Sequence, residues 1–394
     1  MEERVAPGKT MPVQLDTVAS AIAAIAEGQL VIVVDDADRE NEGDLIMAGA
    51  KASPEQVAFM IRHTSGILCT PLPPEQARRL RLDPMVALND APMRTAFTVS
   101  VDHRFGLTTG ISADERSNTV RALANANAAP DDFVRPGHIF PLIGRDGGVL
   151  VRSGHTEAAI DLARLAGLPP VGLLAELVND DGTVKRMVQL LEFAREHRLT
   201  IISVADLIAY RQQREQLVLR VGGFEVLTEV GPARAIAYAT PFDSLHHLAL
   251  IIGDLGDGVD VPVRIHREQV ISDVFARRDG QPASLVPANL IPKALQRLGG
   301  KGRGVLIYLR EGAAGVAASP PDAELAAGME ATAEVAGAGT ERARAQQWRE
   351  VGIGAQILRD LGVASIRLLA TRHRHYVGLS GFGIDITATE LIDG

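Results

Sequence analysis

The chain has 394 residues, 46% of them hydrophobic and 23% charged, and a net charge of −9 at pH 7, as expected of a soluble globular protein with two domains. The acidic balance gives no support to a nucleic-acid or anionic-membrane partner, and no apolar run approaches the roughly 20 residues of a membrane span. The single cysteine, Cys69, excludes an internal disulfide and a cysteine-rich zinc site. The N-terminus is polar, and we see no secretory signal in it. Together these features favour a cytoplasmic protein.

Helical and strand-like segments alternate along the first half of the chain. Helical periodicity predicts helices over 16–27, 54–62, 156–166 and 184–196. Short apolar runs predict strands over 29–34, 66–70, 95–101, 148–151 and 200–204, with 45–52 a strand or a buried connection. This alternation favours an α/β (α+β) fold built on a layered sheet.

A charged helical segment, 207–220, follows, and we place a domain boundary near residue 212, which gives domains 1–212 and 213–394. The second half starts again with strand-like runs over 224–230 and 233–239. Residues 313–345 are rich in small residues, and we expect a loose helix or a partly mobile loop there.

A dense group of carboxylates follows the first predicted strand. Residues 35–44 read D-D-A-D-R-E-N-E-G-D, with six acidic side chains and one arginine. Carboxylates this close resist ionising together unless a cation compensates them, and magnesium prefers carboxylate oxygens and water. A solvated acidic turn is the alternative, but the preceding apolar strand and the enclosed Arg39 and Gly43 favour a site. An EF-hand is excluded because Asn41 and Met47 stand where its loop needs glycine and glutamate.

A second group of candidate residues opens the predicted helix 156–166. Residues 152–157 read R-S-G-H-T-E. A glycine followed by the free N–H groups of a helix start, with Arg152 and Thr156 beside them, suits a phosphate group. His155 suits a metal ligand or a base, and the alternative is a hydrogen-bonded structural histidine.

Two further segments carry single candidate residues. In R-P-G-H-I-F-P-L, 135–142, the flanking glycine and proline predict that His138 lies on an ordered turn. In E-L-V-N-D-D-G, 176–182, Glu176 ends an apolar stretch and D-G forms a tight turn, which taken alone is a weak signal.

Together these four segments resemble one family, 3,4-dihydroxy-2-butanone 4-phosphate synthase, which converts ribulose 5-phosphate to a four-carbon ketone phosphate and formate in riboflavin biosynthesis. The motifs D-D-x-D-R-E-N-E-G-D, R-P-G-H-I-F-P-L, R-x-G-H-T-E and E-L-x-N-D-D-G occur here in the family's order, over roughly residues 13–210. The resemblance implies a lyase that uses magnesium or manganese. It also implies a homodimer with its sites at the subunit interface.

The resemblance assigns a role to each candidate residue. Glu40 and His155 are the implied metal ligands, and His138 and Glu176 are the implied catalytic residues. The implied substrate-binding residues are Arg39, Glu40, Asp44, Arg152, Ser153, Gly154, His155, Thr156 and Glu176. A chelating cation would acidify the C–H beside the sugar carbonyl and stabilise an enediolate. Carboxylate and imidazole groups would then move protons through dehydration, skeletal rearrangement and formate loss.

The second half resembles GTP cyclohydrolase II, which implies a second α/β domain. Residues 263–269, V-R-I-H-R-E-Q, follow that family's R-V-H-S-E-C. Residues 304–312, G-V-L-I-Y-L-R-E-G, follow its G-V-x-x-Y-L-R-Q-E-G-R-G. Residues 351–362, V-G-I-G-A-Q-I-L-R-D-L-G, follow its Y-G-I-G-A-Q-I-L-x-D-L-G.

The second half departs from that family at its chemistry. The family holds zinc with three cysteines, whereas Gln269 stands at the first cysteine's place and C-D-C is absent from 275–281. Ala313 replaces the arginine of E-G-R-G, and R-H-R replaces the N-N-P stretch at 372–374. We expect no zinc, and no substitute metal site at His373 and His375, because no cysteine or acidic partner lies in that segment.

Three hypotheses for the second half follow. The one we favour is an active synthase joined to a cyclohydrolase-like domain that has lost its zinc site and serves stability or assembly. The second is a bifunctional enzyme whose second site works without the usual zinc. The third is a module that binds a nucleotide, a flavin-pathway enzyme or a regulator, which is compatible with an active first domain.

Overall fold

The structure is a computed structural model that describes residues 15–35, 39–241, 245–268, 270, 273–274, 290–310, 352–371 and 384–392. The chain divides into two compact units. Unit 1 comprises Met1–Asn89, Thr95–Gly144 and Gly154–Leu207, and unit 2 comprises Asp90–Arg94, Arg145–Ser153 and Ile208–Gly394. No helix in the described part of the chain is long and apolar enough to cross a membrane.

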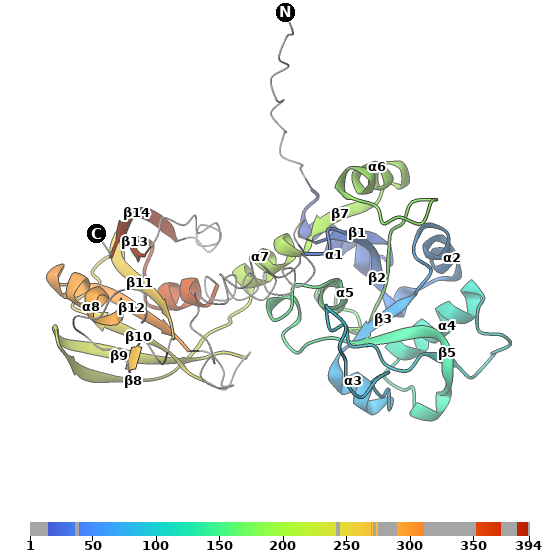
Figure 1. Cartoon of the computed structure of the whole chain (residues 1–394), viewed down its shortest axis with the longest axis horizontal. Helices are drawn as coiled ribbons and strands as arrows, with labels where there is room; N and C mark the ends of the chain where they lie inside the picture. The colour runs from blue at the N-terminus through green and yellow to red at the C-terminus, as the bar shows by residue number, and fades with distance from the viewer. Residues whose placement is uncertain are drawn as a thin grey trace, which may run out of the picture. The chain divides into compact units, whose positions relative to one another are not determined.

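Unit 1 is built on a mixed seven-stranded sheet with the strand order β4-β5-β3-β6-β2-β1-β7 (Figure 1). Its strands are β1 (Val31–Val34), β2 (Gly43–Ala48), β3 (Cys69–Leu72), β4 (Val101–His103), β5 (Phe133–Ile143), β6 (Gly172–Glu176) and β7 (Thr200–Ser203). Its helices are α1 (Val18–Ala26), α2 (Pro54–His63), α3 (Pro74–Arg79), α4 (Ala113–Ala124), α5 (His155–Leu165) and α6 (Met187–His197), with α7 (Val204–Arg214) crossing into unit 2.

The central strands β1 and β2 explain where the candidate residues lie. Every residue of both strands is buried, as expected for strands covered on both faces. They run antiparallel with Val34 opposite Gly43, so the acidic run 35–42 is the loop that joins them at one end of the sheet. Helix α5 packs on β2 and β6, which brings its N-terminal residues to the sheet.

Unit 2 contains a second mixed seven-stranded sheet, with the order β14-β13-β11-β12-β10-β9-β8. Its strands are β8 (Leu219–Thr228), β9 (Gly231–Ala239), β10 (His247–Ile252), β11 (Val261–Arg267), β12 (Gly304–Leu309), β13 (Ser365–Ala370) and β14 (Asp385–Leu391). Two apolar clusters lie on opposite faces of this sheet and are formed by alternate residues of its strands. In β12, for example, Ile307 belongs to one cluster and its neighbour Leu306 belongs to the other. One cluster includes α8 (Leu290–Gly300) and the other includes the helical residues 352–360, so helices cover both faces.

The predicted α/β class is confirmed, with a mixed sheet in each unit, but several local predictions are wrong. Residues 148–151 form a 3-10 turn instead of a strand, because Gly147 and Gly148 both adopt positive φ angles. His138 lies inside β5 and not on a turn. The segment 207–220 is not one helix, since α7 ends at Arg214 and β8 begins at Leu219. Residues 313–345 lie outside the described part of the chain.

The domain boundary near residue 212 stays a prediction. The two units divide inside α7, between Leu207 and Ile208. Gln356 fixes the residues that follow: its side-chain amide donates to the carbonyls of Gln212 (2.8 Å) and Glu215 (2.7 Å), and its oxygen accepts the N–H of Leu217 (2.6 Å). The end of α7 is therefore capped by a side chain from the second half of the sequence.

Candidate active site

The loop after β1 is shaped by one buried carboxylate. Asp35 is 6% exposed and accepts the backbone N–H groups of Glu40 (3.0 Å) and Glu42 (2.9 Å). The Arg39 guanidinium lies 2.8 Å from Asp35 and 2.9 Å from the Glu40 carboxylate. Arg39 thus sets the position of Glu40 through charge-assisted contacts. Asp36 and Asp38 of the acidic run lie outside the described residues.

Asp35, Glu40 and His155 form a group that could hold a metal ion, with one ligand atom from each within 4.8 Å of the others. His155 is the first residue of α5 and is 6% exposed. Its Nδ1 lies 3.6 Å from Glu40 and 3.9 Å from Asp44. The predicted metal ligands Glu40 and His155 are therefore close together, and Asp35 is a third candidate that the sequence analysis did not single out.

Asp44 adds a further buried charge beside this group. It is 2% exposed and lies directly opposite Glu176 in the β2–β6 ladder. The pKa of Asp44 is raised to about 8. Burial is the largest cause, and the nearby charges of Glu176 and Glu40 also raise this pKa, whereas His155 lowers it. Burial lowers the pKa of His155, but Asp44 and Glu40 outweigh it and bring that pKa to about 9. Without a cation, the cluster therefore retains protons at neutral pH.

Two buried atoms show that the cluster suits a cation. Asp44 Oδ1 and His155 Nε2 are buried and have no hydrogen-bond partner within the described part of the chain. Leaving such groups unpaired costs free energy, so a site that contains them is built for a ligand. Carboxylate oxygens with one imidazole nitrogen are a donor set that magnesium or manganese accepts.

Glu176, at the end of β6, is held by Ser65. The Ser65 hydroxyl donates to Glu176 Oε2 (2.7 Å), and the Ser65 N–H donates to the Glu176 carbonyl (2.9 Å). Because Glu176 stands opposite Asp44, the structure brings this predicted catalytic residue to the same end of the sheet as the metal-ligand candidates.

His138 lies elsewhere in the sheet, on β5, and has Asp102 of β4 as its polar partner. The His138 Nδ1 lies 2.7 Å from Asp102 Oδ2, and the His138 N–H donates to Asp102 Oδ1 (2.8 Å). Gly110, at φ +84°, leaves room for this pair, since a Cβ there would collide with the Asp102 carboxylate and the His138 ring. Among the described contacts, none joins His138 to the acidic cluster.

The remaining predicted substrate contacts precede or begin α5. Gly154 is the N-cap residue and supplies no side-chain cap, so the first N–H groups of the helix are not satisfied by a capping side chain. Thr156 is 7% exposed. Arg152 donates to the Met93 carbonyl (3.2 Å), and both residues belong to unit 2. The roles of Arg152, Ser153, Gly154 and Thr156 in phosphate binding stay predictions.

Arg186 is a positioning residue that the sequence analysis missed. It lies just before α6, and its Nη1 donates to the carbonyls of Glu40 (2.8 Å) and Asn41 (2.6 Å). Asn41 has a φ of 54°, so the loop turns sharply where Arg186 holds it. No sequence signal marks Arg186, because its acceptors are backbone carbonyls about 145 residues away. Asp102 was missed for a similar reason, since it meets His138 only through the fold.

Motif residues of unit 2 form a separate polar group. His266 Nε2 lies 2.9 Å from Asp273, and the Tyr308 hydroxyl donates to the other Asp273 oxygen (2.9 Å). Arg310 Nε lies 3.2 Å from Glu268. Gln269, Ala313, residues 275–281 and residues 372–375 lie outside the described part of the chain. Cys69, the one cysteine of the sequence, is buried in β3 of unit 1.

We predict that Arg186→Ala weakens binding of magnesium or manganese by about 10-fold, because the loop that presents Glu40 loses both contacts to the guanidinium. Isothermal titration calorimetry of the folded variant with Mn²⁺ measures this. Arg195→Ala, a matched change at an exposed position within α6, should leave the affinity unchanged. An Arg186→Ala affinity equal to that of the unaltered chain would contradict the positioning role.

Two family models match the chain in succession. Residues 19–210 match the model for 3,4-dihydroxy-2-butanone 4-phosphate synthase. Residues 220–390 match the model for GTP cyclohydrolase II. The order of the two matches agrees with the motifs and with the two sheets.

Similar proteins cover almost the whole chain. The riboflavin biosynthesis protein RibBA of Nocardia farcinica is 46% identical over 381 residues, which are 95% of this chain and 90% of that protein. The crystal structure of RibBX, a two domain 3,4-dihydroxy-2-butanone 4-phosphate synthase from A. baumannii, is 36% identical with a TM-score of 0.76, and the match covers 95% of this chain and 100% of that one. A 3,4-dihydroxy-2-butanone 4-phosphate synthase in complex with two magnesium ions is 42% identical with a TM-score of 0.50, over 51% of this chain and 98% of that one.

The family models and this coverage agree with the site geometry. The chain therefore belongs to the family of two-domain riboflavin biosynthesis proteins in which a 3,4-dihydroxy-2-butanone 4-phosphate synthase domain precedes a GTP cyclohydrolase II domain.

Proposed function

We propose that unit 1 converts D-ribulose 5-phosphate to L-3,4-dihydroxy-2-butanone 4-phosphate and formate, with magnesium or manganese held by Glu40 and His155 and assisted by Asp35. The observation that carries this proposal is the convergence of these three side chains within 4.8 Å in a synthase domain. A related synthase binds two magnesium ions. The bound cation would act as a Lewis acid that makes the C–H beside the substrate's carbonyl more acidic.

The protein's own groups would position the substrate and move its protons. Ser65 fixes one oxygen of Glu176, and the other oxygen, for which the described part of the chain offers no partner, would face the substrate as a base or an acid. The Asp102 carboxylate, 2.7 Å from Nδ1 of His138, favours a proton on that nitrogen and leaves Nε2 for proton transfer. The first N–H groups of α5, which no capping side chain satisfies, would bind the substrate phosphate together with Arg152 and Thr156.

We infer that the second domain lacks GTP cyclohydrolase II activity. That chemistry needs a zinc ion held by three cysteines in the family resembled, and the chain has only Cys69, in the other domain. The A. baumannii protein, similar over 95% of this chain, is described as a two domain synthase. Residual cyclohydrolase activity without zinc, or a nucleotide- or partner-binding module, are the alternatives.

We further propose a homodimer located in the cytoplasm. His138 is 40% exposed at its side chain and makes no described contact with the acidic cluster. A half-exposed catalytic histidine of this kind suits a site that is completed by a second subunit. Sedimentation velocity of the unaltered chain tests the dimer, and a purely monomeric active protein would contradict it.

The synthase activity has a direct test. Purified chain with ribulose 5-phosphate and magnesium should release formate and the four-carbon ketone phosphate. Carbon NMR measures both products, and EDTA should stop the formation of both.

Glu40→Gln should lower turnover by more than about 100-fold, because this change removes a candidate metal ligand itself and not a residue that only contacts a ligand. Glu196→Gln, at an exposed position on α6, should retain full activity. Undiminished turnover in the Glu40 variant would contradict the metal assignment.

The second domain has an equally direct test. The unaltered chain incubated with GTP, with and without added zinc, should release no formate, because the three-cysteine site cannot form. The same preparation must turn over ribulose 5-phosphate, which shows that it is folded and active. Formate release from GTP that depends on zinc would overturn the inference and establish a bifunctional enzyme.

A further inference from the structure

β8, the last strand of the unit 2 sheet, has exposed apolar side chains and one edge without a neighbouring strand among the described residues. β8 ends the strand order, so one of its edges has no neighbouring strand in the described structure. Its large apolar residues are exposed: Leu219 at 61%, Val221 at 45%, Phe224 at 58% and Leu227 at 82%. Proteins usually blunt such edges, and one left open is a template for pairing with another strand.

The sequence of this strand is complementary to itself in the antiparallel direction. Residues 218–227 read V-L-R-V-G-G-F-E-V-L. The ladder between β8 and β9 passes over Val221, since Arg220 pairs with Tyr238 and Gly222 pairs with Ala237. If two copies of β8 pair about Gly223 with the same bulge, Arg220 of each copy stands opposite Glu225 of the other.

The neighbouring pairs in this register are also complementary. Leu219 stands opposite Val226 of the second copy, and Gly222 stands opposite Phe224. A Cβ at Gly222 would meet nothing within 4 Å, so there is open space beside it for an aromatic ring. Aromatic–glycine, apolar and opposite-charge pairs across strands each stabilise a sheet. No like charges face one another in this arrangement.

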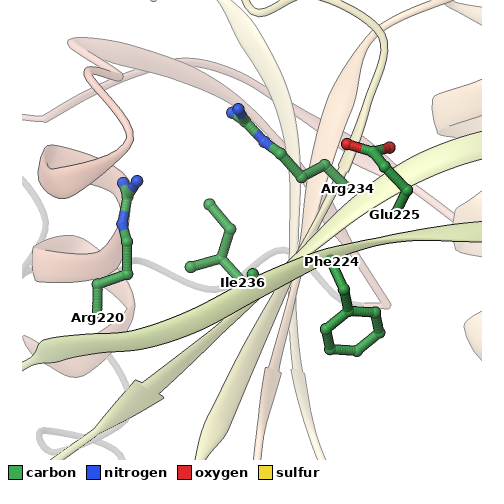
Figure 2. A pocket seen from close by; sticks show the side chains of 6 residues that line it. Arg220, Phe224, Glu225, Arg234 and Ile236 are labelled. Carbon is green, nitrogen blue, oxygen red and sulfur yellow. The ribbon is translucent and has the colours of Figure 1, made fainter.

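A pocket of about 350 Å³ lies over β8 and β9 beside Gly223, the residue at the centre of this pairing (Figure 2). It is lined by Arg220, Gly223, Phe224, Glu225, Arg234 and Ile236. Figure 2 shows Phe224 on the opposite side of the strands from Ile236, as expected for the two faces of a sheet. The Arg220 guanidinium is already paired with Asp360 at 2.6 Å, so Glu225 of the second copy would join an existing ion pair.

We propose that β8 pairs antiparallel with β8 of a second copy of this chain, centred on Gly223, and joins two seven-stranded sheets into one continuous sheet. Self-pairing about a two-fold axis is the closed arrangement that satisfies this edge in both copies at once. The second copy is favoured over an unrelated strand because the complementarity is already present within the sequence of β8.

A disulfide across the two-fold axis tests this register. In Gly223→Cys, the two new cysteines would be opposite one another at a Cα separation of about 4.5–5.5 Å, which suits a disulfide. A Cβ at Gly223 makes only ordinary contacts, 3.4 Å from the Ala235 carbonyl and 3.7 Å from Ile236, and the native Cys69 is buried. Mild oxidation of the full chain should give a disulfide-linked dimer on a non-reducing gel.

Leu227→Cys is the matched control on the same strand. Its two thiols would lie roughly 27 Å apart in this register, so it should cross-link at least 10-fold more slowly. Equal rates for Cys at the two positions would overturn the proposal.

Adding Glu225→Arg to Gly223→Cys places the new arginine opposite Arg220 of the other copy. Repulsion between the two arginines should slow cross-linking about 10-fold, with synthase turnover unchanged. An unchanged cross-linking rate would show that the thiols meet through a different contact.

If a variant fails to fold, hydrogen exchange of the unaltered chain tests whether β8 pairs with β8 of a second copy. Pairing at β8 should slow exchange of its outward amides, and the protection should fall as the protein is diluted to the monomer. Fast exchange along β8 at every concentration, with β9 protected, would contradict the proposal.

Discussion

The repulsion between buried carboxylates at one end of the unit 1 sheet is the constraint on which the rest of the site depends. Asp35, Asp44 and His155 are all buried, and Glu176 faces Asp44 across the ladder. Burying charges in this way costs free energy unless protons or a cation compensate them. The raised pKa of Asp44 and the buried atoms of Asp44 and His155 that lack a partner among the described residues both result from that constraint. A divalent cation would relieve both at once.

The scaffold around the cluster supplies positive charge and rigidity without filling the site. Arg39 lies between Asp35 and Glu40, and Arg186 holds the loop through backbone carbonyls, so neither needs to leave for a ligand to bind. Ser65 and Asp102 do the same for Glu176 and His138. Each reactive side chain therefore has a partner that fixes its orientation, which is how active sites reach a defined geometry.

Much of this site could be predicted from sequence, because the motifs that carry it are short and local. The family resemblance carried by the acidic run and the R-S-G-H-T-E segment implied Glu40 and His155 as metal ligands, and the structure places His155 Nδ1 3.6 Å from the Glu40 carboxylate. The contacts of Asp102 and Arg186 could not be predicted, since each depends on residues brought together by the sheet. The strand predicted over 148–151 was wrong because the apolar pattern does not show that Gly147 and Gly148 adopt positive φ angles. These angles turn the chain and prevent an extended strand. In unit 2 the motifs indicated a fold but not the open edge of β8.

Glu40 and His155, together with Asp35, are the proposed ligands of a divalent cation. Electron spin-echo spectroscopy of the unaltered chain loaded with Mn²⁺ tests this assignment most directly, because a coordinated imidazole nitrogen modulates the echo. We expect nitrogen modulation from one histidine, which is lost in His155→Gln and retained in His138→Gln. Bound Mn²⁺ without nitrogen modulation, or modulation that survives His155→Gln, would contradict the assignment.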